Sequence, residues 1–111
     1  MATATMTKRQ GRQPGYEYSA NILDGVTGPS VIIPPMGNEG GVITCTIIPG
    51  GNSGKIQFTT STDAKVAADT AVWQDWPKGN VSTTESDSLL GPVTAVRGVS
   101  ASGAIDIEII C

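Results

Sequence analysis

The fold class of this chain is decided by residues 41–60, which read GVITCTIIPGGNSGKIQFTT. Two runs in this stretch, residues 41–48 and 55–60, place apolar side chains at every second position, the periodicity of a strand with one buried face. In the first run that face is formed by Ile43, Cys45 and Ile47. Residues 49–54 are Pro, Gly, Asn and Ser, which favour turns and tolerate positive φ. The stretch therefore predicts two short strands joined as a β-hairpin.

Short strands bounded by turn residues continue on both sides of this stretch. Further strands are expected at residues 31–33, 71–76, 92–100 and 104–111. The last of these alternates most regularly, and its inner face would hold Ile105, Ile107, Ile109 and Cys111. It should form a second hairpin with the strand before it, whereas residues 64–72 could supply no more than a helical turn. The sequence thus predicts an all-β fold, a small antiparallel β-sandwich or barrel over residues 21–111.

Residues 1–20 lack apolar periodicity and contain two Gly and one Pro, so we interpret them as an extended N-terminal arm that a partner orders. This arm carries Lys8, Arg9 and Arg12 against Glu17, which leaves −5 for the rest of a chain whose net charge is −3. A short basic arm could touch nucleic acid or an acidic protein surface, but the acidic body argues against a nucleic-acid-binding domain.

The arm is the first candidate interface. Arg pairs with carboxylates in a planar, bidentate way, and Tyr offers apolar area with a polar tip, so both are common at interfaces. We expect five arm residues to contact a neighbouring subunit, namely Lys8, Arg9, Arg12, Tyr16 and Tyr18. On this interpretation, deletion of residues 1–19 should leave a folded body that attaches poorly to its partner.

Length and composition limit the class of protein. With 111 residues and 39% hydrophobic content, the chain has room for one domain with a thin core. No stretch approaches the ~20 apolar residues of a membrane span, and residues 1–20 lack the apolar centre of a secretion signal. We expect synthesis as a soluble cytoplasmic chain without a membrane partner.

The chain has two cysteines and no histidine, a combination that cannot complete a four-ligand zinc site. Cys45 is expected to be a buried small apolar residue with a reduced thiol. Cys111 is expected at the end of a sheet, with a dispensable side chain. The sequence predicts neither a metal nor a cofactor.

Catalytic signatures are weak. The lack of histidine excludes catalytic pairs in which a histidine activates a Ser or Cys nucleophile. Asp106 and Glu108 would lie about 7 Å apart on one strand face, a spacing that a glycosidase pair can use, but no cleft-forming insertion accompanies them. Residues 50–55 differ from a phosphate-binding loop because Ile56 replaces the metal-binding hydroxyl and the loop leads into a strand. We therefore predict a non-enzymatic protein in which these carboxylates keep a strand face solvated.

Two aromatic residues and one cation are further candidates for an interface. Trp73 and Trp76 should point to opposite faces of an extended segment, so one would belong to the core and the other to a rim or interface. We assign Trp76 to the interface. Arg97 lies within an apolar strand, where it is expected either to pair with Asp75 or Glu108 or to face a partner.

Several segments, taken in order, resemble a group of small virion proteins of tailed bacteriophages. They are GKIQFTT (54–60), WQDW (73–76) with Gly79 after it, GPVTAVR (91–97), and Ser102-Gly103 before the final strand. The resemblance covers about half of the chain and concerns structural motifs. It implies a β-sandwich that sits on or between capsid or tail subunits, forms homo-oligomers or binds a lattice, and assembles in the host cytoplasm.

The expected function is accordingly that of a phage virion structural protein, a capsid decoration or cement protein that binds at subunit junctions. Its partners would be the major capsid protein or other virion subunits. A tail or neck component is one alternative. A receptor- or carbohydrate-binding module that uses Trp73 or Trp76 is another.

Overall fold

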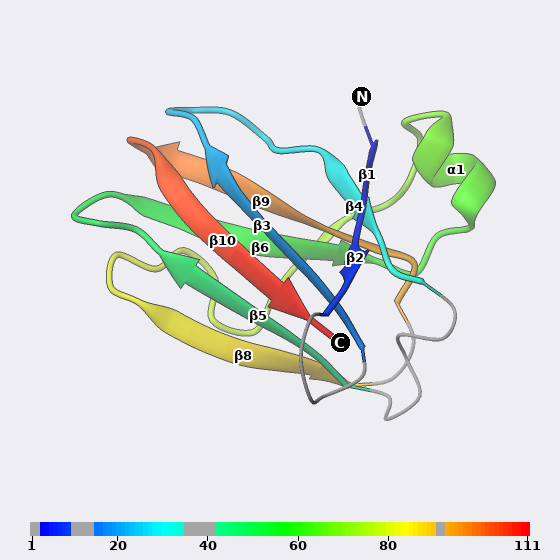
Figure 1. The fold of residues 1–111 in the computed structure, drawn as a ribbon. Coiled ribbons are helices and arrows are strands. Elements are labelled where there is room, and N and C mark those ends of the chain that lie inside the picture. The colour runs from blue at the N-terminus through cyan, green and yellow to red at the C-terminus, as the bar shows by residue number, and fades with distance from the viewer. Residues whose placement is uncertain (1–2, 10–14, 35–41, 91–92) are drawn as a thin grey trace.

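The computed structural model describes residues 3–9, 15–34, 42–90 and 93–111. Within these ranges the chain forms ten strands and one short helix, which build two sheets packed face to face (Figure 1). The elements are β1 (Thr3–Thr5), β2 (Thr7–Lys8), β3 (Tyr16–Ile22), β4 (Ser30–Ile32), β5 (Val42–Ile48), β6 (Ser53–Thr59), α1 (Asp63–Ala67), β7 (Gln74–Asp75), β8 (Glu85–Leu90), β9 (Ala95–Ser102) and β10 (Ile105–Ile110). The predicted all-β sandwich is confirmed.

The strand order is that of a jelly roll. Sheet A has the order β1-β4-β9-β6-β7, and sheet B has the order β2-β3-β10-β5-β8. All neighbouring strands are antiparallel except β1 and β4, which are parallel. From β3 onward the chain alternates between the sheets, apart from the step from β6 to β7, so the eight strands β3 to β10 wind into the double-sheet arrangement of jelly rolls.

Neither predicted hairpin pairs its two strands. β5 pairs with β10 and β8 in sheet B, whereas β6 pairs with β9 and β7 in sheet A. The turn after Pro49 carries the chain from one sheet to the other, and Gly50 and Gly51 supply the positive φ that it needs. The turn at Gly103 moves the chain between the sheets in the same way. Asn52 joins the two turns, since its side-chain amide donates to the carbonyl of Ala104 over 2.8 Å.

The core lies between the two sheets and follows the predicted alternation. In β5 and β10 the inward side chains are fully buried, and they are Ile43, Cys45, Ile47, Ile105, Ile107 and Ile109. Sheet A contributes the fully buried Val31, Ile56 and Val96. Each such side chain stabilises the fold by roughly 1.5–3 kcal/mol. The prediction that Cys45 is a buried apolar residue is confirmed.

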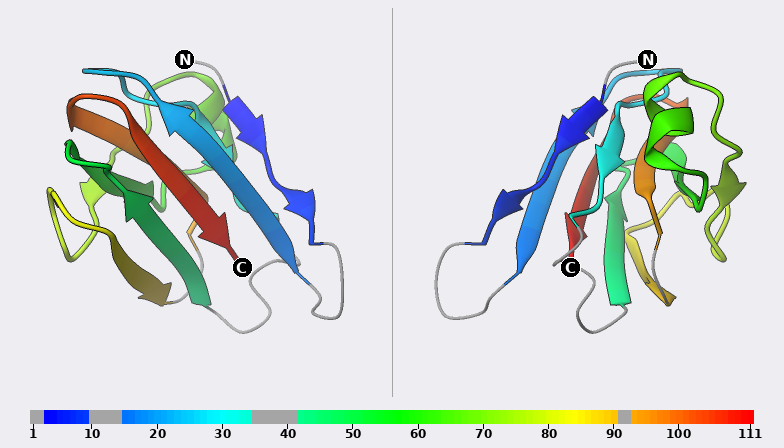
Figure 2. Two further views of the ribbon diagram at one scale, coloured as in Figure 1. Left: turned by 60° about the vertical axis from the view of Figure 1, so that its left-hand side comes forward. Right: turned by 90° about the vertical axis from the view of Figure 1, so that its right-hand side faces the viewer.

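The N-terminal residues are extended, as predicted, but they belong to both sheets (Figure 2). β1 adds to the edge of sheet A beside β4, and β2 adds to the edge of sheet B beside β3. Between them, Met6 is buried against the core. β3 lies inside sheet B between β2 and β10, and it crosses the expected boundary at residue 20. The described part of residues 1–20 is therefore a component of the sandwich and not an arm that leaves it.

The segment between β6 and β7 contains the short helix that residues 64–72 were expected to allow. Thr62 caps α1 by accepting a hydrogen bond from the backbone N–H of Lys65, and Val66 is the buried residue of the helix. On the strand below, Thr59 is fully buried and donates its hydroxyl hydrogen to the carbonyl of Val72 over 2.7 Å. This segment thus covers part of sheet A. None of the described helices has the length and apolarity to span a membrane.

Candidate functional site

The predicted arm residues do not form one exposed group. Lys8 is exposed at the end of β2 and Arg9 is half-buried, while Arg12 lies outside the described residues. Tyr16 and Tyr18 are half-buried and pack against the core, because they occupy the inward positions of β3. Both tyrosines therefore help to build the sandwich, and their contact with a neighbouring subunit stays a prediction.

Trp76 is a core residue, so its assignment to an interface is wrong. Its side chain is 2% exposed, and its indole N–H donates to the carbonyl of Gly79 over 2.6 Å. Its backbone N–H donates to the carbonyl of Ile56 over 2.9 Å. Trp73 is the half-buried member of the pair, which agrees with the expectation that the two rings would have different surroundings.

Arg97 belongs to a network on the outer face of sheet A. Its guanidinium lies over the Trp73 ring, 4.1 Å from the centroid, and its Nε donates to Oε1 of Gln57 over 2.9 Å. The amide of Gln57 donates in turn to Asp75 over 3.0 Å, and Lys55 Nζ lies 3.1 Å from the Asp75 carboxylate. Of the two partners predicted for Arg97, Asp75 is thus linked to it through Gln57, whereas Glu108 lies on the other sheet.

This network is balanced in charge. Hydrogen bonds from Gln57 and Lys55 lower the pKa of Asp75, and partial burial lowers the pKa of Arg97. Asp69 also acts on Arg97 through its charge and opposes that shift. Two cations therefore face two carboxylates, and the polar groups of this face largely satisfy one another.

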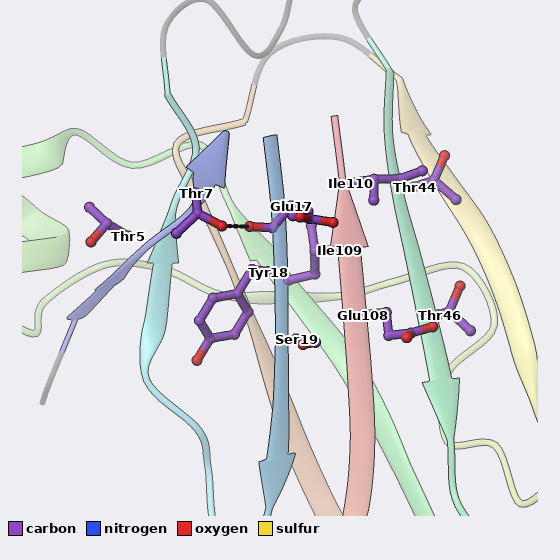
Figure 3. Close-up of a pocket in the computed structure, with 10 residues that line it drawn as sticks. All are labelled: Thr5, Thr7, Glu17, Tyr18, Ser19, Thr44, Thr46, Glu108, Ile109 and Ile110. Atoms are coloured by element: carbon purple, nitrogen blue, oxygen red, sulfur yellow. Dashed lines mark hydrogen bonds between the residues drawn. The ribbon is translucent and has the colours of Figure 1, made fainter. Parts of the chain in front are cut away.

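The outer face of sheet B differs, because it carries an open groove of about 590 Å³ (Figure 3). Glu17 from β3 and Glu108 from β10 line it, together with Thr44 and Thr46 from β5. Ile110 lies in the same groove, directly between Glu17 on one neighbouring strand and Thr44 on the other. None of the described residues that line the groove is Lys or Arg.

The rest of this outer face continues the same chemistry. Hydroxyl pairs join β5 to β8, where Thr46 and Ser86 lie 2.7 Å apart and Thr44 and Ser88 lie 3.3 Å apart. Three β-branched residues are also exposed on it, namely Val42 (40%), Ile48 (37%) and Ile110 (38%). The prediction that the carboxylates of β10 keep a strand face solvated fits this surface, but Glu17 was not expected there. The alternation of Tyr16, Tyr18, Ala20 and Ile22 with polar residues is the signal that could have revealed β3.

Burial disfavours the thiolate form of both cysteines. Burial raises the pKa of Cys45 to about 12, and the charges of Cys111 and Asp87 add to the shift. Burial also raises the pKa of Cys111, whose sulfur lies 3.8 Å from that of Met6. Both thiols therefore stay protonated near neutral pH. Among the described residues, no three His, Cys, Asp or Glu side chains gather to hold a metal ion.

Comparisons with known proteins support the fold alone. No family model and no curated protein matches this chain. A solved oxalate oxidase aligns with 86% of the chain and 41% of its own length, at 9% identity and a TM-score of 0.50. An HTH_3 family transcriptional regulator from Vibrio cholerae (12% identity, TM-score 0.46) aligns with 87% of this chain and 42% of its own. A cupin domain from Bordetella pertussis (11% identity, TM-score 0.40) covers 99% of this chain and 95% of its own. The chain thus spans about two-fifths of the first two proteins.

Proposed function

We propose that this protein is a structural component of a phage particle, a capsid decoration or cement protein that binds at junctions between capsid subunits. Jelly rolls build viral capsid proteins, but also lectins and cupins, so the fold alone does not select a function. The observation that carries the proposal is the outer face of sheet B, which Figure 1 views from the front. Its five strands form a broad surface on which most side chains are exposed.

The composition of this face suits contact with another protein. Partly exposed apolar residues at the ends of β5 and β10 lie among hydroxyl and carboxylate groups, and protein interfaces likewise combine apolar and polar groups. Glu17 and Glu108 are exposed and make no catalytic arrangement with a nucleophile or a base among the described residues. The resemblance of residues 54–60, 73–76 and 91–97 to phage virion proteins supports a phage particle as the assembly in which this contact is made.

Single-particle reconstruction of purified particles tests this proposal. Density for the jelly roll at capsid subunit junctions, with sheet B turned toward the shell, is the expected result. Purified protein should also rebind particles that lack it, and Ile110→Lys should weaken rebinding while Val72→Lys, at a 68% exposed site away from sheet B, should not. Density at the neck or tail would assign the protein there instead, and its absence from particles would refute the structural role.

A carbohydrate-binding module is the second candidate, and it rests on Trp73. Trp76 is buried and unable to stack on a sugar, whereas Trp73 is half-buried and has Arg97 over one side of its ring. A sugar could stack only on the remaining side of the Trp73 ring. A glycan array with Trp73→Ala as control separates the two candidates, because a cement protein should bind no glycan.

A further inference from the structure

We propose that the outer face of sheet B docks on a positively charged protein surface, one whose Lys or Arg side chains flank apolar residues. This inference deepens the proposed function and rests on it for the identity of the partner as a particle subunit. The docking chemistry itself follows from the charges and the exposed apolar groups of the face.

Among the residues that the structure describes, no Lys or Arg lines the groove or forms an ion pair with Glu17, Asp106 or Glu108. Asp106 and Glu108 are two residues apart on β10, so they lie about 7 Å apart on the same side of the sheet. Glu17 is diagonal to Glu108 across the β3–β10 ladder, again at about 7–8 Å. Asp106 accepts a hydrogen bond from the Asn21 amide over 2.9 Å. Because this amide is neutral, it does not compensate the negative charge of Asp106. A cationic partner would therefore relieve repulsion between three like charges.

The apolar part of the face explains why the partner should be a protein surface. Ile110 is 38% exposed although it lies on a central strand of the sheet. Ile48 on β5 is opposite Asp106, so an apolar side chain stands beside a carboxylate there as well. Carboxylate side chains that lie directly beside β-branched ones match a surface on which cationic groups lie beside apolar groups.

A second copy of this chain fits the face less well. A two-fold contact between two such faces would bring Glu17 and Glu108 of one copy against the same carboxylates of the other. The cations on the outer face of sheet A, Lys55 and Arg97, are engaged in their own network. A nucleic acid would be repelled by the same carboxylates. A basic surface on a different protein is the occupant that the charges favour.

A designed peptide tests the docking chemistry without the particle. The sequence Lys-Thr-Val-Thr-Lys-Thr-Val-Thr-Lys, when extended, places Lys and Val alternately on one side at a spacing of about 7 Å. Titration into the ¹⁵N-labelled full chain should shift the amide signals of Glu17, Glu108 and Ile110, and the binding should weaken as salt rises. The same peptide with Glu in place of Lys should cause no shift.

Two matched variants locate the binding. Glu108→Gln should weaken peptide binding by about two- to five-fold, the effect of removing one exposed ion pair. Glu85→Gln removes the same charge from sheet B, but from the side of β8 that faces away from the groove and pairs with Lys78, so binding should not change. Shifts outside the groove, equal losses in both variants, or no binding of the Lys peptide would overturn the proposal. Absence of the protein from particles would refute the proposed function but leave these results unaffected.

Discussion

Truncation of the N-terminus is the sharpest test of how the chain builds its two sheets. Deletion of residues 1–9 removes β1 and β2, which contribute three and two register pairs to the edges of sheets A and B. The main energetic loss is the burial of the Met6 side chain, which lies between the two strands and is 7% exposed. Its burial stabilises the fold by about 2 kcal/mol. The lost edge hydrogen bonds are largely offset by the chain entropy that the deletion releases. A domain of this size should lose about 4 °C of melting temperature per kcal/mol, so we expect a decrease of about 8 °C in a folded protein.

Deletion of residues 1–19 should have a different outcome. It removes more than half of β3 and three of its six register pairs with β10. The packing of Tyr16 and Tyr18 against the core is lost, and the fully buried Ile109 loses Tyr18, one of its two neighbours in the sheet. The summed loss is about 5–8 kcal/mol, which reaches the total stability of a typical domain. The shorter chain should therefore be unfolded or aggregated, contrary to what the sequence alone suggested.

Circular dichroism and thermal melting of both truncated proteins measure these effects. Met6→Ala in the full chain is the control, since it should reproduce most of the loss caused by removing residues 1–9. Native-like melting after deletion of residues 1–19 would show that β3 is not an essential strand of sheet B. An unchanged melting temperature for Met6→Ala would show that the segment between β1 and β2 is not anchored in the core.

Three further predictions concern single side chains. Cys45→Ser should lower the free energy of unfolding by roughly 1–3 kcal/mol, because it places a hydroxyl in an apolar site, and native Cys45 should resist thiol labelling. A double-mutant cycle on Arg97 and Trp73 should give a coupling of about 0.5–1 kcal/mol in urea unfolding, while additive losses would contradict their contact. The lowered pKa of Asp75 means that its stabilisation is present above its unfolded pKa, near pH 4, and is lost as the pH falls through its folded value. Asp75→Asn should therefore remove part of the acid dependence of stability, which urea unfolding below pH 5 would reveal.

The sequence predicts those strands whose two faces differ clearly. β5 and β10 alternate isoleucine with polar residues, so their inward faces could be assigned before the structure was known. Turn residues indicate where the chain reverses, but they do not indicate whether it returns in the same sheet. The turns after Pro49 and at Gly103 both carry the chain into the opposite sheet.

Other elements escaped prediction for identifiable physical reasons. β3 begins in a polar, basic segment, and its alternation depends on two tyrosines that suit an interface as well as a core. β8 has Glu85 and Asp87 at inward positions on the edge of sheet B, which hides the apolar pattern of a strand. The candidate face required β3, β10 and β5 side by side, and this neighbourhood follows from long-range pairing that local sequence does not encode.

The strands of sheet B are more acidic than those of sheet A, and this difference gives the surface of the molecule an electrostatic polarity. The strands of sheet B carry five carboxylates and one cation, namely Glu17, Glu85, Asp87, Asp106, Glu108 and Lys8. The strands of sheet A carry Lys55 and Arg97 against Asp75 alone. Glu85 and Asp87 occupy inward positions, so the outer face of sheet B holds Glu17, Asp106 and Glu108, while Lys55 and Arg97 on sheet A are balanced by Asp75 and Asp69. A positively charged surface would therefore attract the outer face of sheet B at distances within a Debye length. This protein would thus turn the outer face of sheet B toward that surface before any contact forms.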